Sequence, residues 1–399
     1  MIKNNQKIPE GWSVKKLKDV ANVITGSTPP TSDLTNYGTE YLFVSPVDIK
    51  DNVKFINNTV TKLSFKGHSL GRVVSAGSPL FVCIGSTIGK IAIAGQTLTT
   101  NQQINSCIVN NQNDNEFLYY VLLFNANKIR QLAGEQAVPI INKSTFEKIS
   151  FIFPPLPEQE KIAEILGTWD EAIEKLSSLI EQKKLLKKGL MQRLLTGKYR
   201  LKGFSSPWSE VRLGDILHEN NERTIVQNQH TVLSVTKNGI CSQSEYFDKQ
   251  IASENNIGYK VLHKYNVVFS PMNLWMGSLG FSEYDVGIVS PAYKIFTINP
   301  QYGVFNFLKY FMICPKMINL YAVNSEMGAS VVRRNLDLQS LLSSKIVIPD
   351  LAEQRAITEI LSKADEEIEL LNKKLEAFKQ EKKALIQKLL TGQTRVKVN

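Results

Sequence analysis

The 399-residue sequence contains few cysteines and histidines, four of each. The cysteines lie tens of residues apart and form no C-x-x-C pair; they are Cys83, Cys107, Cys241 and Cys314. Structural zinc sites and disulfide frameworks need ligands or partners at characteristic spacings. The sequence therefore predicts neither, and we expect reduced, buried thiols.

Long apolar runs are also lacking. The most apolar stretch, residues 304–323, is interrupted by Lys309, Pro315 and Lys316, whereas a membrane-spanning helix needs about 20 consecutive apolar residues. The N-terminal sequence MIKNNQKIPEGW contains no apolar segment of the kind found in signal peptides. We therefore expect a cytoplasmic protein.

The composition that remains is that of a globular protein with a basic excess. The chain is 43% hydrophobic and 21% charged, which argues against general disorder. Its 47 basic and 37 acidic side chains give a net charge of +10. Such an excess favours a polyanionic partner such as nucleic acid, although many proteins are mildly basic without one.

An internal duplication organises the chain. Residues 154–202 and 349–397 align without a gap at an offset of 195 and share 25 of 49 residues. A weaker echo precedes each copy, where Trp12-x4-Leu17-x-Asp19 returns as Trp208-x4-Leu213-x-Asp215. The chain therefore consists of a variable unit followed by a repeated segment, twice over.

The two kinds of segment predict different structures. The variable units, residues 1–153 and 203–348, alternate short β-type runs with turn signals, and each contains one apolar helical stretch. We predict an α+β domain with a curved, mainly antiparallel sheet for each. The repeated segments, residues 154–202 and 349–399, predict long helices at about 158–195 and 353–390 that end before Gly197 and Gly392.

Apolar residues recur along both helices at alternating spacings of three and four, the pattern of a coiled-coil seam. The predicted seam residues are Trp169, Ile173, Leu176, Ile180, Leu190, Leu194, Ile368, Leu371, Leu375, Phe378, Leu385 and Leu389. Three further seam positions hold lysine: Lys183, Lys187 and Lys382. Because long amphipathic helices need a partner face, we expect an antiparallel coiled coil with a pseudo-two-fold axis. The alternative is that each helix packs only on its own domain.

The repeated motifs resemble one protein family. Pro154-x-Leu156-x-Glu158-Gln159 and its copy at 349–354 open the helices, and both copies end in L-x-x-L-L-T-G. This arrangement resembles the DNA-specificity subunit of type I restriction–modification systems over nearly the whole chain. The second copy departs from the first at Asp350 and Ala352, which loosens the turn slightly.

The resemblance implies two target-recognition domains, 1–153 and 203–348, with a central and a distal conserved helical region, 154–202 and 349–399. It also implies a non-catalytic DNA-binding role beside two adenine methyltransferase subunits and restriction subunits. S-adenosylmethionine, ATP and Mg²⁺ would belong to those partners, and none to this chain. The alternative class is a stand-alone coiled-coil interaction or architectural protein.

Enzyme motifs are matched only superficially. The loop Gly85–Ile91 resembles a P-loop, but only three residues separate its glycines, and Ile91 occupies the position of the Mg²⁺-binding hydroxyl. No Asn-Pro-Pro-aromatic methyltransferase loop is present. Pro349-Asp350 and Glu381-x-Lys383 match a nuclease pattern, but about 31 helical residues would hold them tens of Å apart.

DNA contacts are predicted where polar side chains cluster beside strands, because Asn and Gln suit adenine and Arg and Lys suit guanine or phosphate. In the first domain the candidates are Ser86, Thr87, Lys90, Asn101, Gln102, Gln103, Asn105 and Lys143. In the second they are Asn273, Trp275, Ser278, Tyr293, Arg333 and Arg334. Sequence matching pairs 102–105 with 290–293, and 142–143 with the paired arginines. A solvated loop or a core role is the alternative for each.

The helix length also predicts target geometry. A helix of about 57 Å, at 1.5 Å per residue, corresponds to roughly 17 base pairs at 3.4 Å each. Two domains at opposite ends would therefore read two short half-sites across an unread spacer. Inserting four residues mid-helix adds about 6 Å and should lengthen the preferred spacer by one or two base pairs.

Overall fold

The computed structural model describes residues 8–51, 53–134, 138–236, 239–243, 255–330 and 333–398, with only the backbone described at 327–330 and 333. The chain forms two compact units: Met1–Leu179 with Leu371–Asn399, and Ile180–Leu370. Each unit therefore contains one globular domain together with part of each long helix. None of the described helices is long and apolar enough to cross a bilayer.

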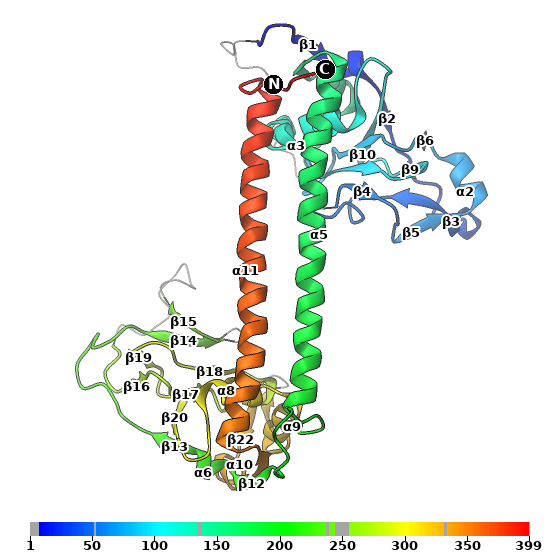
Figure 1. The fold of residues 1–399 in the computed structure, drawn as a ribbon. Helices are drawn as coiled ribbons and strands as arrows, with labels where there is room; N and C mark the ends of the chain where they lie inside the picture. The colour runs from blue at the N-terminus through cyan, green and yellow to red at the C-terminus, as the bar shows by residue number, and fades with distance from the viewer. Residues whose placement is uncertain are drawn as a thin grey trace. The chain divides into compact units, whose positions relative to one another are not determined.

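The domain of the first unit contains two main sheets, several of whose strands are labelled in Figure 1. Buried residues of both sheets form one core cluster. The larger sheet has the order β2-β10-β7-β8-β4 and the smaller one β5-β3-β9-β6. Their strands are β2 Ala21–Thr25, β3 Tyr37–Val44, β4 Phe55–Ile56, β5 Thr61–Leu63, β6 Val73–Val74, β7 Pro79–Val82, β8 Ile91–Ala94, β9 Leu98–Thr100 and β10 Ile104–Val109. Only the β3–β9 and β4–β8 pairs are parallel among the described pairings. The expected mainly antiparallel α+β fold is confirmed.

Several helices and a separate two-stranded sheet complete this domain. Strands β1 Ser13–Lys16 and β11 Ser150–Phe153 pair antiparallel and bring its two ends together. The helical elements are α1 Leu17–Val20, η1 Leu34–Asn36, α2 Phe65–Leu70, α3 Asn115–Arg130 and α4 Lys143–Glu147. Helix α3 begins at the Asp114 cap, whose carboxylate accepts the Phe117 N–H at 2.7 Å.

The domain of the second unit repeats this plan with fewer strands in its main sheet. That sheet has the order β13-β20-β17-β18, which matches β2-β10-β7-β8. Its strands are β12 Ser209–Arg212, β13 Leu217–Asn220, β14 Leu233–Thr236, β15 Gly239–Ser242, β16 Lys260–His263, β17 Val267–Phe269, β18 Leu279–Phe281, β19 Val286–Val289, β20 Lys294–Ile298, β21 Ser325–Ser330, β22 Arg333–Leu336 and β23 Lys345–Ile348. Its helical elements are α6 Leu213–Ile216, η2 Leu274–Met276, α8 Phe305–Phe311, α9 Pro315–Val323 and α10 Leu338–Ser343.

Strand registers align the two domains residue by residue. Asn105 pairs with Phe81 across β10 and β7, and Lys294 pairs with Phe269 across β20 and β17. The segment that matches 102–105 is therefore 291–294, one residue later than sequence matching gave. Sparse identities could not fix a strand register, whereas the paired backbones do.

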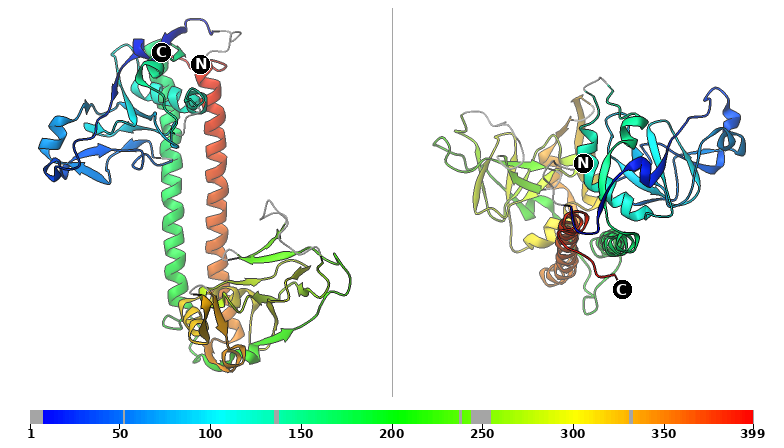
Figure 2. Two further views of the ribbon diagram at one scale, coloured as in Figure 1. Left: turned by 180° about the vertical axis from the view of Figure 1, so that it is seen from behind. Right: turned by 90° about the horizontal axis from the view of Figure 1, so that it is seen from above.

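The two repeated segments form helices α5, Leu156–Leu194, and α11, Leu351–Leu390. Both begin two residues earlier than expected. In α5 the earlier start includes Pro157, which fits the first turn of a helix because its missing N–H is not needed there. Both stop as expected before a glycine in the left-handed region, Gly197 at φ 70° and Gly392 at φ 68°. Within each unit the α5 and α11 segments lie side by side and run in opposite directions (Figure 2).

The predicted seam residues lie between the helices or in the domain cores. In the first unit the Trp169 and Phe378 rings meet edge to face with centroids 5.4 Å apart. In the second, Ile180 and Leu194 are each only 2% exposed. Seam lysines also pair across the helices, Lys382 with Asp170 and Lys187 with Asp365. The alternative in which each helix packs only on its own domain is therefore wrong.

Each domain core includes the start of one long helix and the end of the other. In the first unit, Ile162 and Leu166 of α5 and Leu389 of α11 are buried with the domain's aromatic residues. The second unit has an equivalent cluster, which contains Leu194 and Leu195 from the end of α5 and Ile357 and Leu361 from the start of α11. Burial of about 1.5–3 kcal/mol per large apolar side chain makes domain and helix pair one folded body in each unit.

Candidate nucleic-acid interface

The repeated Glu-Gln dipeptide anchors each domain to the start of a long helix. In the second unit the Glu353 side chain is 1% exposed. Its carboxylate accepts two hydrogen bonds from the Arg200 guanidinium at 2.7 Å each and a third from Trp208 Nε1 at 3.1 Å. The carboxylate raises the pKa of Arg200. A buried carboxylate without these donors would be strongly destabilising.

The first unit contains the same anchor at an offset of 195 or 196. Glu158 accepts from Arg395 Nε at 2.7 Å, from Arg395 Nη2 at 2.8 Å and from Trp12 Nε1 at 3.1 Å. The tryptophan begins the domain, the glutamate begins one helix, and the arginine follows the end of the other helix. The motif therefore joins three distant chain segments at one buried point.

The glutamines beside these carboxylates extend the anchor to the domain helices. The Gln159 amide donates to Pro154 O at 2.9 Å and accepts the Asp114 N–H at 3.0 Å. The Gln354 amide donates to Pro349 O at 2.9 Å and accepts the Val304 N–H at 2.8 Å. Both side chains are fully buried. The duplicated motif is thus a structural joint, which accounts for its identity in the two copies.

A second repeated network lies farther along the helices. In the first unit the Tyr120 hydroxyl donates to Asp170, which also pairs with Lys382. In the second unit the Tyr310 hydroxyl donates to Asp365 at 2.7 Å, and Asp365 pairs with Lys187. Burial and the hydrogen bond to the neighbouring carboxylate raise the pKa of Tyr310. These networks hold each domain against its helix pair.

The predicted polar cluster of the first domain divides into buried and exposed members. Asn105 is 2% exposed, accepts from the Thr25 hydroxyl at 2.7 Å and donates to Cys83 Sγ at 3.2 Å. Its amide therefore bonds within the domain, which favours the core alternative at this predicted contact. Asn101 is also buried and bonds to Gln103. Gln102 is exposed beside the Thr28 hydroxyl, which donates to it at 2.6 Å.

In the loop that follows β7, most backbone N–H groups are already paired within the domain. The Gly85 N–H donates to Pro139 O at 2.9 Å and the Gly89 N–H to Val82 O at 3.1 Å. Those of Ile88 and Lys90 donate within the loop. Ser86 is exposed and Thr87 half-buried, so their hydroxyls remain candidates, whereas the Lys90 ammonium donates to Ile49 O.

The matching loop of the second domain brings three predicted residues together. Asn273 precedes η2, Trp275 lies within it, and the Arg334 guanidinium stacks on the Trp275 ring at 4.2 Å. Gly277, at φ 80°, turns the chain away after η2. Ser278 is 8% exposed and lies at the position of Lys90. Of the predicted cluster, Trp275 and Arg334 are in direct contact.

Three other predicted residues lie elsewhere. Tyr293 is half-buried and packs against the second domain's smaller core cluster. Lys143 opens α4 and pairs with Glu147 at 3.5 Å. Because α4 matches α10, Lys143 corresponds to Leu338, and the expected match to the paired arginines is wrong. Arg333 begins β22, and its side chain lies outside the described part of the chain.

Sequence reasoning missed one pair of matched cations. Arg72 is exposed, and its guanidinium donates to Thr25 O at 2.7 Å. At the same register position of the second domain, Lys260 is 3% exposed and donates to the Asn221 side chain at 3.0 Å. Burial lowers the pKa of Lys260, and the charge of Lys294 adds to the effect. No short motif marks these residues, because only strand pairing aligns them.

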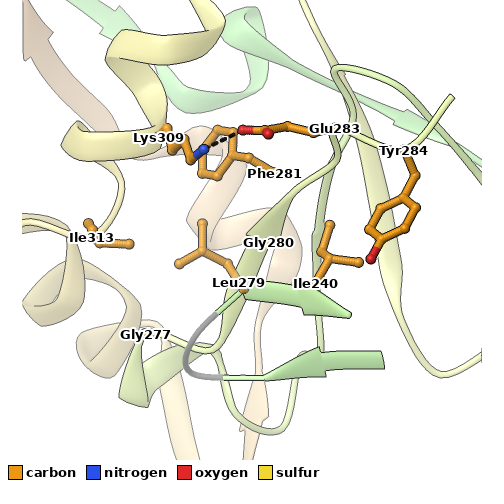
Figure 3. Close-up of a pocket in the computed structure, with 10 residues that line it drawn as sticks. Ile240, Gly277, Leu279, Gly280, Phe281, Glu283, Tyr284, Lys309 and Ile313 are labelled. Atoms are coloured by element: carbon orange, nitrogen blue, oxygen red, sulfur yellow. Dashed lines mark hydrogen bonds and ion pairs between the residues drawn. The ribbon is translucent and has the colours of Figure 1, made fainter. Parts of the chain in front are cut away.

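Both domains also have a groove, beside β8 in the first domain and beside β18 in the second. In the first unit it has a volume of about 950 Å³, and its lining contains six cations and three carboxylates: Lys50, Lys54, Lys90, Lys379, Lys382 and Lys383 with Asp51, Asp170 and Glu174. In the second unit the groove is smaller, about 570 Å³. Figure 3 shows Leu279 and Phe281 near its Lys309–Glu283 ion pair. The two copies thus differ in charge. Among the described residues no group of His, Cys, Asp or Glu could hold a metal.

The fold and its doubled anchors define a protein of two similar α+β domains carried on paired antiparallel helices. The family described as "Type I restriction modification DNA specificity domain" matches residues 9–182 and 205–380. The chain belongs to this family, as its repeated motifs predicted.

Individual relatives match either nearly the whole chain or about half of it. It is 24% identical to the type I restriction enzyme MjaIX specificity subunit of Methanocaldococcus jannaschii, covering 98% of this chain and 95% of that one. It is 33% identical to the HindI specificity subunit of Haemophilus influenzae over 48% of this chain and 42% of that one. The fold is similar to that of the type I S subunit from M. genitalium, with a TM-score of 0.56, 16% identity and coverage of 97% and 98%.

Proposed function

We propose that this chain is a non-catalytic specificity subunit that reads a bipartite, asymmetric DNA target, one half with each domain. It acts in the cytoplasm with two adenine methyltransferase subunits and with restriction subunits, which supply S-adenosylmethionine, ATP and Mg²⁺. The family membership supports the class, and the net charge of +10 suits a DNA ligand.

One observation supports two different half-sites. The domains share strand order and anchors, yet their loops differ in chemistry at matching positions. Thr87 corresponds to Trp275. Ile140 corresponds to Arg334, because Ile140 forms a β-bridge with Ile84 and the Arg334 N–H donates to the O atom of Met272, the residue equivalent to Ile84. Two surfaces of one shape and unlike side chains suit two unlike sequences of bases.

A protein partner on the helices has separate support. Leu185, Leu186 and Leu370, all in the second unit, are 68%, 57% and 68% exposed on α5 and α11. Leu185 and Leu186 are neighbours on α5, and exposed apolar surface of this kind occurs at protein–protein contact sites. We assign this surface to a methyltransferase subunit.

The test is a methylome comparison of the host with and without this gene. We expect one bipartite adenine-methylation mark to disappear on deletion and to return with the intact gene. A matched gene with residues 203–348 taken from a relative should change only one half of the mark. Retention of every mark after deletion would refute the proposal, as would a change in both halves after the exchange.

A further inference from the structure

We propose that Arg334, held on the ring of Trp275, is a contact for a DNA phosphodiester group in the second domain. This inference rests on the proposed function. It assigns Arg334 the role of ligand contact and Trp275 that of a positioning residue, and it predicts no such contact at the matching place in the first domain.

The arginine is fixed in place from two sides. Its backbone N–H donates to Met272 O at 3.3 Å, which ties β22 to the loop before η2. Its guanidinium lies 4.2 Å from the centre of the Trp275 ring, and Nη1 is 3.5 Å from Ala322 O. Stacking on tryptophan holds the planar guanidinium flat and limits its rotamers.

Among the described residues the Arg334 charge has no counter-charge. Arg200 and Arg395 each grip a buried glutamate with two nitrogens, whereas no carboxylate among the described residues forms an ion pair with Arg334. On the paired strand, Met327 lies opposite Arg334 and Glu326 lies opposite Asn335. A half-buried guanidinium without an anion is electrostatically incomplete, so an incoming anion gains interaction free energy there.

The hydrogen bonding is incomplete as well. Arg334 Nε and Trp275 Nε1 are both buried, and neither has a hydrogen-bond partner in the part of the chain that the structure describes. Buried donors almost always have an acceptor in folded proteins, and leaving two of them unpaired costs stability. Such a cost is characteristic of a site whose acceptors come from a ligand.

The position favours phosphate over a base edge. The major groove is about 8.5 Å deep, and a side chain that reads bases must extend into it. The Arg334 guanidinium instead lies back against its own domain on Trp275 and reaches only what presses on the surface. Phosphate oxygens lie on the outside of a duplex and take charged contacts of this kind.

The first domain offers no equivalent. The residues at the matching positions are Thr87 and Ile140, neither of which carries charge. The contact therefore belongs to one domain only and adds affinity without adding sequence information.

The experiment measures binding of the full chain to a random-sequence 40-base-pair duplex pool at several salt concentrations. Arg334→Ala should lower the slope of log K against log salt by about one. Between about 50 and 200 mM salt, that variant should lose about 3.5-fold less affinity than wild type. Lys345→Ala is the matched control, because it removes one exposed cation of the same unit that pairs only with Glu210.

Two further variants separate folding from contact. Trp275→Phe keeps a stacking ring and should keep the wild-type slope, whereas Trp275→Ala should behave like Arg334→Ala. Arg334→Lys keeps the charge and should retain most of the slope. Base preferences selected from the pool should be the same for all variants.

An unchanged slope in Arg334→Ala would overturn the inference, and so would loss of preference at one base, which would make Arg334 a base reader. Should Arg334→Ala fail to fold, Trp275→Ala decides instead: a slope lowered as predicted supports the contact, and an unchanged slope contradicts it. Wild-type protein that binds no DNA would instead refute the proposed function.

Discussion

Removing one hydroxyl from each copy of the tyrosine network should destabilise the two units unequally. Tyr310 donates one hydrogen bond, at 2.7 Å, to Asp365, whose side chain is 44% exposed. Because water replaces part of that bond, Tyr310→Phe should cost about 1 kcal/mol. Tyr120 donates to Asp170, which is 23% exposed, and accepts from Lys54 Nζ at 2.8 Å. Two bonds to charged groups are lost there, so Tyr120→Phe should cost about 2–3 kcal/mol.

Hydrogen exchange measured by mass spectrometry can assign each loss to its unit. Tyr120→Phe should speed exchange in residues 156–179 and 371–390, and Tyr310→Phe in residues 180–194 and 351–370. Tyr302→Phe is the control, since the Tyr302 hydroxyl makes no hydrogen bond with a described residue. Equal losses of unfolding free energy in the two variants, or a larger loss in Tyr310→Phe, would refute the conclusion that the Tyr120 network contributes more stability.

Three other perturbations test the scaffold. Burial raises the pKa of Tyr120, Tyr310 and Tyr321 above the ordinary value of 10, so the unfolded chain releases these protons first and stability should fall as pH rises above about 10. Urea midpoints at pH 8 and pH 11 measure this, with a smaller fall in Tyr120→Phe. Burial also raises the pKa of the Cys83 thiol to about 12, so a thiol reagent at pH 8 should label half-buried Cys241 well before Cys83; equal rates would contradict the core placement. Ile180→Ala, at a side chain 2% exposed, should cost about 2–4 kcal/mol, whereas Leu185→Ala, 68% exposed on the same helix, should cost little by urea unfolding.

The helices and their pairing could be predicted because their signals are periodic and repeated. The spacing of apolar residues is enough to predict the seam. The same spacing places Lys187 on the seam, where it pairs with Asp365 of the other helix. The role of Glu158 and Gln159 could not be predicted, because their partners Trp12, Arg395 and Asp114 are distant in the sequence. The motif was visible, but the joint it forms depends on tertiary structure.

Contact residues were harder to predict, since residue type does not report burial. Asn105 has the side chain that suits adenine, yet it lies inside the sheet and bonds to Thr25 and Cys83. Trp275 and Arg334 are 59 positions apart in the sequence, and only the folded chain brings them together. Arg72 and Lys260 were overlooked because their match appears only through strand register.

The uneven divergence of the two copies has a physical cause in these networks. Each anchor joins three segments through charged, buried groups, so changing Glu353 alone leaves Arg200 and Trp208 without their acceptor, and compensation requires several changes at once. Loop positions such as Thr87 and Trp275 lie outside these networks and can change singly. Duplication of such a fold therefore preserves the joint and frees the recognition loops. Exchanging Thr87 for tryptophan should accordingly leave the unfolding free energy within about 0.5 kcal/mol of wild type, whereas exchanging Trp12 for threonine should unfold the first unit; similar losses in urea unfolding would contradict this division of roles.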